Sequence, residues 1–140
     1  MRLLIDFRAA LRQRSGVGEY AYELVRALLA LPDSMPARRS LTVTLFSSSA
    51  RDRLQADPAL RGAHLVDRRV PVRLLNFMWH RLGWPPADAL ARGPVDVSHS
   101  MHPLIMPTRG GAHVVTIHDL NFLRHPERTR AEIRRDYPAL

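Results

Sequence analysis

A histidine and an aspartate directly follow an apolar run in the last third of the sequence. The run, residues 114–117, reads Val-Val-Thr-Ile, and His118 and Asp119 come next. Such a β-branched run is typical of a buried strand in a parallel sheet, and open α/β sheets bind ligands beyond the carboxyl ends of their strands. We therefore predict a ligand site at His118 and Asp119. The structural alternatives are a backbone hydrogen bond for His118 and a turn cap for Asp119.

A glycine-containing segment near the start of the sequence could bind a phosphate. Residues 16–21 read Gly-Val-Gly-Glu-Tyr-Ala, which fits the pattern G-x-G-x-x-A. Glycine lets the backbone approach a phosphate closely, and the free N–H groups of a helix N-terminus attract an anion. We predict a phosphate-binding loop formed by Gly16, Val17 and Gly18, with a ligand-free glycine turn as the structural alternative.

A dinucleotide site would need more than this pattern. Its first glycine should follow the first strand almost at once, and an acidic residue should end the second strand to hold the ribose. Here eight residues, 8–15, separate Phe7 from Gly16, and residues 47–49 after the second apolar run are all serine. These two departures disfavour a nicotinamide or flavin cofactor.

Histidines gather in the last third of the sequence, which raises the question of a metal. Five of the seven histidines lie there, namely His99, His102, His113, His118 and His125. A zinc site needs three or four ligands that converge on one point. We expect His113 to begin a strand at the opposite edge of the sheet from His99 and His102. No metal site is therefore predicted.

Strand-like and helix-like segments alternate along the chain and would position these residues. The apolar patterns predict strands over residues 3–5, 41–46, 63–66, 95–98 and 114–117, and helices over 20–31, 50–55, 72–84 and 130–137. Alternating strands and helices predict an α/β fold, a Rossmann-like three-layer domain with a mostly parallel sheet. A length of 140 residues fits one such domain, residues 1–140.

The charge of the chain is strongly positive and is carried by arginine. The net charge is +8, and all 21 basic residues are arginine. Arginine binds phosphate and carboxylate groups in bidentate fashion, although codon bias in a GC-rich genome explains the absence of lysine equally well. The arginines are scattered along the sequence rather than clustered, so no nucleic-acid partner is expected.

Composition and hydropathy also bear on location. The sequence has no cysteine and no apolar run near the roughly 20 residues that span a bilayer, which predicts a cytoplasmic protein. Residues 72–84 combine helical spacing of apolar residues with Arg73, Arg81 and two tryptophans. Basic amphipathic helices of this kind lie at membrane surfaces, so peripheral contact with the inner face of the membrane stays open. The structural alternative is that the apolar stripe packs in the core.

Three segments together resemble a known enzyme family. They are residues 12–20 (RQRSGVGEY), residues 96–99 (DVSH) and residues 114–120 (VVTIHDL) followed by 125–127 (HPE). In this order and approximate spacing they resemble the N-terminal domain of a GT-B glycosyltransferase of family 4. Ile5-Asp6 and residues 124–126 are similar to that family as well. The resemblance covers nearly the whole chain.

The resemblance implies an activity and a set of partners. Such enzymes transfer a hexosyl group, with retention, from a nucleotide-sugar donor to the hydroxyl of a carbohydrate or lipid-linked acceptor. The donor is a co-substrate, and neither a tightly bound cofactor nor a metal is expected. The family's second, donor-binding domain has no counterpart in this sequence. The chain is therefore expected to be the acceptor-side half, inactive alone and partnered by a C-terminal domain.

The resemblance also implies a role for individual residues. The loop of residues 16–18 would lie beneath the donor phosphates, and Tyr20 would help form the floor of the cleft. His118 would contact the donor sugar while Asp119 orients it, and these two carry the catalytic prediction. His99 and His102 would lie towards the acceptor.

Two other functions stay open at this stage. One is a non-catalytic, basic α/β module that binds anionic ligands such as nucleic acid or a membrane surface. The other is a dinucleotide-binding domain. The first predicts binding that weakens steeply with salt and discriminates little among ligands, whereas a transferase predicts saturable, sugar-specific binding.

Overall fold

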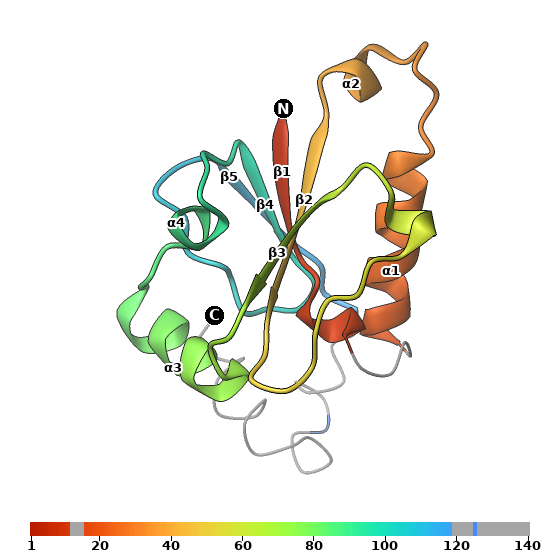
Figure 1. Cartoon of the computed structure of the whole chain (residues 1–140). Helices are drawn as coiled ribbons and strands as arrows, with labels where there is room; N and C mark the ends of the chain where they lie inside the picture. The colour runs from red at the N-terminus through yellow and green to blue at the C-terminus, as the bar shows by residue number, and fades with distance from the viewer. Residues whose placement is uncertain (12–15, 119–124, 126–140) are drawn as a thin grey trace.

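The computed structural model describes residues 1–11, 16–118 and 125 and shows a parallel sheet of five strands (Figure 1). The strands are β1 (Arg2–Asp6), β2 (Thr42–Ser48), β3 (His64–Arg68), β4 (Val97–Ser100) and β5 (Ala112–Val115). Their order in the sheet is β3-β2-β1-β4-β5, and every neighbouring pair is parallel. The predicted α/β, Rossmann-like three-layer fold is confirmed.

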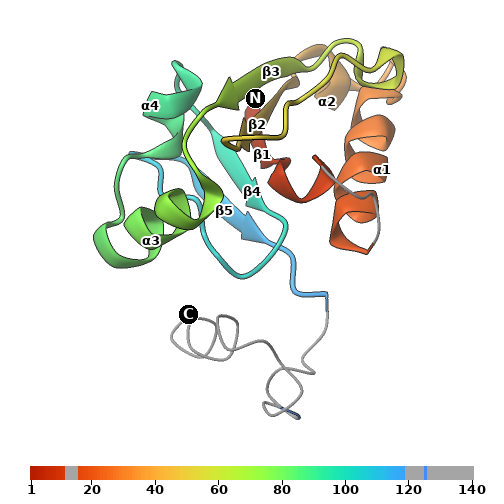
Figure 2. The same cartoon turned by 60° about the horizontal axis from the view of Figure 1, so that its bottom comes forward.

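Helices cover both faces of the sheet (Figure 2). One face carries α1 (Val17–Leu29) with the short 3-10 helices η1 (Arg8–Ala10) and η2 (Pro58–Leu60), and the other carries α3 (Val72–Leu82) and α4 (Ala87–Ala91). The four-residue helix α2 (Pro36–Arg39) precedes β2. Among the described residues, no helix is both long enough and apolar enough to cross a bilayer.

The apolar central strand β1 separates two cores. Leu3 and Ile5 pack on the α1 side with Val25, while Leu4 packs on the α3 side with Leu75. Because successive side chains of a strand point to opposite faces, a strand buried on both sides is apolar without alternation. The run ends at Asp6, so the first charged residue of β1 after Arg2 lies at the carboxyl edge of the sheet.

The last two strands lie about two residues away from their predicted positions. The prediction places the fourth strand at 95–98, but Asp96 is held outside it because its carboxylate accepts hydrogen bonds from the Arg2 backbone (2.7 Å) and guanidinium (2.6 Å). The fifth strand begins early because Gly111, with φ +91°, lets the chain turn tightly against residues 95–96 before pairing starts at Ala112. His118 therefore lies three residues beyond β5.

The helix predicted over residues 50–55 is wrong. The Ser49 hydroxyl accepts hydrogen bonds from the backbone N–H groups of Arg51 and Asp52, as in a helix cap, but no helix follows. Instead the Asp67 carboxylate on β3 binds the backbone of Leu54 and the side chain of Arg53. This tie to β3 holds the segment in an extended path. The predicted helix at 130–137 lies outside the described residues.

The strand order places a topological switch point between β1 and β4. The chain leaves β1 through α1 on one face of the sheet, whereas it leaves β4 through residues 101–111, of which Leu104 and Met106 belong to the core on the other face. Connections that part to opposite faces leave a crevice at the carboxyl ends of the two strands, where α/β proteins bind ligands. The candidate site is therefore sought at the ends of β1 and β4.

Candidate functional site

Two histidines predicted as site residues lie near the ends of β4 and β5. His99 of β4 lies with its Nε2 2.8 Å from the hydroxyl of Thr116, just after β5. His118 donates from Nε2 to the carbonyl oxygen of Met101 at 2.9 Å. Each histidine thus ties one strand end to the other, and the segment after β5 is held against β4.

Tyr20 joins these histidines from the first turn of α1. Its hydroxyl lies 3.5 Å from the Thr116 hydroxyl, and its ring meets the His118 ring edge-on, with centroids 5.0 Å apart and an interplanar angle of 85°. The tyrosine is 39% exposed, although helical spacing alone predicts that it lies on the buried face of α1. We call Tyr20, His99, Thr116 and His118 the open group.

Hydrogen-bond chemistry fixes how the imidazole of His118 is protonated. A carbonyl oxygen can only accept, so the His118 Nε2 that lies on the Met101 carbonyl must carry a hydrogen. No hydrogen bond to His118 Nδ1 exists within the described part of the chain. Burial lowers the pKa of His99, which is therefore neutral at pH 7. The open group thus offers hydroxyl and imidazole groups for hydrogen bonding, and none of its four members is a carboxylate or a guanidinium.

The glycine segment, residues 16–18, lies at the same edge of the sheet. Its two glycines are required for different reasons. Gly18 is buried, and a Cβ atom there would stand 2.6 Å from the carbonyl oxygen of Ala9, so packing against η1 requires glycine. Gly16 is exposed, has φ +54°, and accepts the first helical hydrogen bond from the N–H of Tyr20 at 3.0 Å. Half-buried Val17 packs against the core. The packing alternative explains Gly18, and among the described residues no side chain caps the N-terminus of α1 at Gly16.

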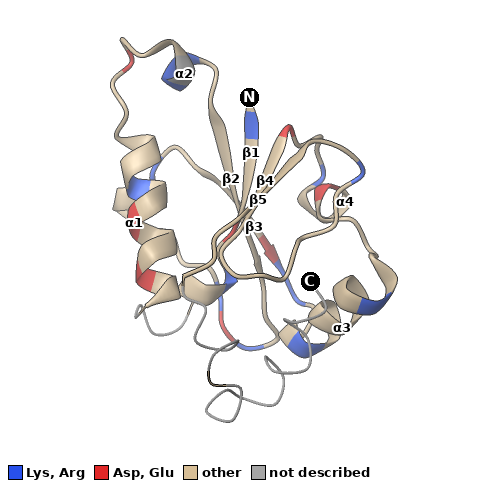
Figure 3. Ribbon diagram, turned by 180° about the vertical axis from the view of Figure 1, so that it is seen from behind, with Lys and Arg blue, Asp and Glu red and all other residues tan. Residues whose placement is uncertain are grey.

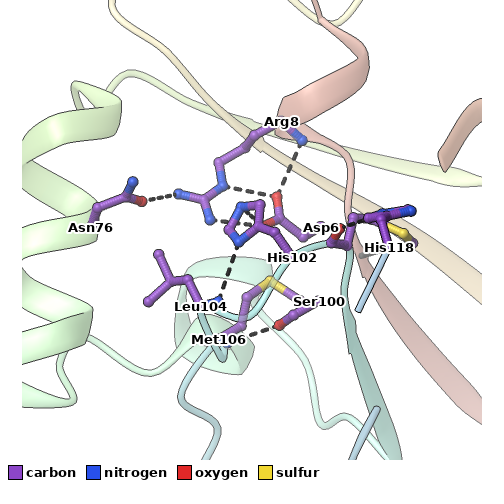
Figure 4. Close-up of polar contacts among 9 residues, drawn as sticks. Asp6, Arg8, Asn76, Ser100, His102, Leu104, Met106 and His118 are labelled. Carbon is purple, nitrogen blue, oxygen red and sulfur yellow. Dashed lines mark hydrogen bonds and ion pairs between the residues drawn. The ribbon is translucent and has the colours of Figure 1, made fainter. Parts of the chain in front are cut away.

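A second polar group lies on the α3 side of the same strand ends (Figure 4). Arg8 donates to both carboxylate oxygens of Asp6, from Nε at 2.8 Å and from Nη2 at 2.7 Å. Its Nη1 donates to the side-chain oxygen of Asn76 on α3 at 2.7 Å, and its guanidinium carbon lies 4.7 Å from the centroid of the Trp79 ring. We call Asp6, Arg8, Asn76 and His102 the buried cluster.

His102 belongs to this buried cluster rather than to the open group. Its Nε2 lies 3.6 Å from an Asp6 carboxylate oxygen, and its Nδ1 accepts from the backbone N–H of Leu104 at 3.3 Å. Burial lowers the pKa of His102, and the opposing attraction of Asp6 does not offset it. The structure therefore separates His102 from His99, although three positions in sequence make them look like a pair.

The ion pair in the buried cluster keeps its carboxylate charged. Burial by itself would raise the pKa of Asp6, which is 1% exposed. The positive charge of Arg8 and its hydrogen bonds outweigh that cost, so the pKa of Asp6 is lowered. Because both partners already use their main hydrogen-bonding directions on each other, the cluster holds the strand ends together and has little left for a ligand.

Sequence reasoning missed four residues of this region, namely Asp6, Arg8, Asn76 and Thr116. Asp6 and Arg8 carry a signal that could have found them, since a charged residue directly after a buried apolar strand needs a nearby partner of opposite charge. Thr116 was expected to be one more residue of the fifth strand. Its hydroxyl contacts both Tyr20 and His99, which depends on the two-residue shift of β5 and could not be read locally.

Three further features of the predicted site concern Asp119, the histidines as metal ligands and the serines at the end of β2. Asp119 lies outside the described residues. In the part of the chain that is described, no three histidine, aspartate or glutamate side chains are grouped so that they could hold a metal ion. At the end of β2, the Ser48 hydroxyl donates to the Val70 carbonyl at 2.7 Å, so this serine is bonded internally.

Comparisons of the chain with protein-family models, with curated proteins and with solved structures found no match. The assignment of a function therefore depends on the geometry of the site and on the motifs described above.

Proposed function

We propose that this chain is the acceptor-side, N-terminal domain of a retaining GT-B glycosyltransferase similar to family 4, acting in the cytoplasm. In this proposal it takes part in transfer of a hexosyl group from a nucleotide-sugar donor to an acceptor hydroxyl. The observation that carries the proposal is the open group, which brings His118, Tyr20 and His99 together at the switch point. In the sequence, Tyr20 lies 79 residues before His99 and 98 residues before His118.

The hydrogen bonding of the open group suits a neutral polyhydroxyl ligand. His118 is anchored through Nε2, so in the neutral imidazole Nδ1 is an acceptor for a sugar hydroxyl. Tyr20, which is 39% exposed, offers an apolar ring beside it. Sugars present both hydroxyl groups and apolar C–H faces, and this pair of side chains offers a partner for each.

The N-terminus of α1 suits the other half of such a donor. When a sugar leaves a nucleoside diphosphate, negative charge grows on the departing phosphate oxygens. Helix N–H groups that are already in place stabilise such charge by a few kcal/mol per donor. The first turn of α1 begins at exposed Gly16, four residues before the Tyr20 that contacts His118. In the proposal, phosphate and sugar are thus held by adjacent parts of one edge.

Isothermal titration calorimetry with nucleotide sugars tests this function. We expect saturable binding of at least one of the UDP-, GDP- and ADP-linked hexoses to the full-length protein, which in this proposal includes the C-terminal donor-binding domain. The substitution His118→Ala should weaken that binding at least tenfold, which corresponds to about 1.4 kcal/mol.

The matched control is His64→Ala. His64 is an exposed histidine that begins β3, at the opposite end of the sheet from the open group, so its loss should leave the affinity unchanged. Failure of all the donors to bind, or equal affinities for the His118→Ala variant and the unaltered protein, would count against the proposal.

A dinucleotide-binding domain is the second candidate, and the strand order favours it. The order β3-β2-β1-β4-β5 is that of the dinucleotide-binding fold. Against it, β2 ends in Ser47 and Ser48 rather than in an acid. Titration with NADH, followed by its fluorescence, separates the two candidates: micromolar binding of NADH without binding of any nucleotide sugar would favour the dinucleotide domain.

A further inference from the structure

The outward face of α3 is apolar to an unusual degree for a helix at the protein surface. Only Leu75 and Trp79 of this helix are buried in the core. Leu74, Phe77 and Leu82 are 50%, 59% and 64% exposed. Single exposed apolar residues are common, but several large ones together on one element mark an interaction surface.

An exposed tryptophan extends this surface beyond the end of the helix. Gly83 ends α3 in the left-handed conformation, with φ +58°, and Trp84 follows it with 59% of its surface exposed. Tryptophan combines a large apolar ring with a polar N–H and is enriched where membrane and water meet.

Arginines flank the apolar residues, and acidic residues are absent from the helix. Arg73 and Arg81 of α3 are exposed, as is Arg69 just before the helix. In the ribbon of Figure 3, α3 carries positions coloured as basic and none coloured as acidic, in agreement with its sequence VRLLNFMWHRL. At 100° per residue, Arg73, Phe77 and Arg81 succeed one another along one line of the helix surface, and Leu74 lies next to it.

We propose that α3 and Trp84 form a docking surface for an anionic lipid bilayer, with the helix axis parallel to the membrane plane. Leu74, Phe77, Leu82 and Trp84 would enter the boundary between headgroups and acyl chains, and the arginines would contact lipid phosphates. Helices that lie in membrane interfaces combine an apolar face with basic residues in this way.

The side chains favour a lipid surface over a nucleic acid. Nucleic acids bind to basic residues interleaved with aromatic rings on which bases stack. Exposed leucines add nothing to the binding of a nucleic acid, whereas each CH₂ group that they bury among lipid acyl chains favours binding to a membrane. The open aliphatic side chains of Leu74 and Leu82 are therefore the feature that decides between the two partners. The docking proposal stands independently of the proposed sugar transfer.

Co-sedimentation with lipid vesicles tests the docking surface. We expect the protein to sediment with vesicles of 70% phosphatidylcholine and 30% phosphatidylglycerol, and far less with pure phosphatidylcholine. The double substitution Leu74→Ser/Phe77→Ser removes exposed side chains that do not support the core, and it should lower the vesicle affinity at least tenfold. Neutralising Arg73 and Arg81 with glutamine should lower it about fivefold per charge, the equivalent of roughly 1 kcal/mol each near an anionic surface.

Met35→Ser serves as the matched control. Met35 is similarly exposed, at 43%, but lies beside α2 at the opposite end of the molecule from α3 (Figure 1). Its loss should leave vesicle binding unchanged. Circular dichroism of every variant checks that the fold is retained.

Quenching by brominated lipids locates the contact. The chain has two tryptophans, of which Trp79 is buried and Trp84 is exposed. Brominated acyl chains should quench part of the fluorescence on vesicle binding, and Trp84→Phe should abolish that quenching. Vesicle binding that survives Leu74→Ser/Phe77→Ser, or binding to RNA without binding to vesicles, would overturn the proposal.

Discussion

The open group and the buried cluster lie at the same strand ends but differ in how fully their polar atoms are paired. In the buried cluster, the Asp6 and Arg8 side chains are 1% and 5% exposed and bind each other through two hydrogen bonds. In the open group, Tyr20 is 39% exposed, and within the described residues its hydroxyl makes one polar contact, a long one of 3.5 Å to Thr116. The two groups are separated by the sheet itself.

The difference indicates where a ligand can gain energy. A buried ion pair whose partners satisfy each other resists any competing ligand, because breaking it leaves an uncompensated charge in the interior. Exposed hydroxyl and imidazole groups lose little when they exchange a hydrogen bond to water for one to a ligand. We therefore assign the buried cluster to the stability of the strand ends and propose the open group as the binding site.

The largest expected effect is the loss of stability on removing Arg8. The substitution Arg8→Met leaves the Asp6 carboxylate buried without its main partner, which should lower the free energy of unfolding by roughly 3–5 kcal/mol. Urea denaturation followed by circular dichroism measures this loss.

The double variant Asp6→Leu/Arg8→Met is the control. With both charges gone, no buried group is left unpaired, so much of the lost stability should return. A loss below about 1 kcal/mol in Arg8→Met would mean that the pair is not a structural element, and the contrast with the open group would fail.

A smaller effect is expected in the response of stability to pH. Burial lowers the pKa of His102 below its ordinary value of 6.5, so the unfolded chain binds more protons than the folded one in mildly acidic solution. The free energy of unfolding should therefore fall as the pH drops below about 6.5, and it should be insensitive to this group above that value.

The variant His102→Asn sharpens this test. The asparagine side-chain oxygen can replace Nδ1 as acceptor of the Leu104 N–H, but the amide does not titrate. Urea denaturation at pH 7.5 and 5.5 should show a smaller difference for His102→Asn than for the unaltered protein. Part of the difference should persist, since burial also lowers the pKa of His99. Identical pH dependence in the two proteins would contradict the assignment.

The smallest expected effect on stability belongs to Tyr20→Phe in the open group. The hydroxyl is exposed, and its 3.5 Å contact with Thr116 is at the limit of a hydrogen bond. Its removal should change the free energy of unfolding by no more than about 0.5 kcal/mol. A loss above about 1 kcal/mol, measured in the same urea titrations, would show that the open group is itself a structural element.

The sequence predicted those parts of the fold that local patterns determine. The apolar runs of β1 and β2 and the helical periodicity of α1 and α3 are visible over ten or so residues, and all four elements were found. The helix predicted at 50–55 failed because Asp67, more than ten residues later, captures the backbone of Leu54. That competition is a tertiary interaction without a local signal.

The candidate site, like the fold, was predictable only where local patterns and strand order determine it. Strand order brings His99 and His118 to one edge, and the sequence was sufficient to expect that. It could not tell that His102 lies on the other side of the sheet, since this depends on where β4 ends and on the partner Asp6, 96 residues earlier. The backbone hydrogen bond predicted as the structural alternative for His118 is present, at the Met101 carbonyl, and the contact with Tyr20 is present beside it.

The central position of β1 has a consequence for how the chain is made. In the sheet, Leu3 pairs with Val43 on one side and with Val97 on the other. During synthesis β1 therefore emerges before either neighbour, and its second edge stays open until β4 has been translated. Parallel pairing across such separations is slow, and unpaired apolar strands aggregate. A chain truncated before β4 should therefore aggregate rather than form a smaller folded unit.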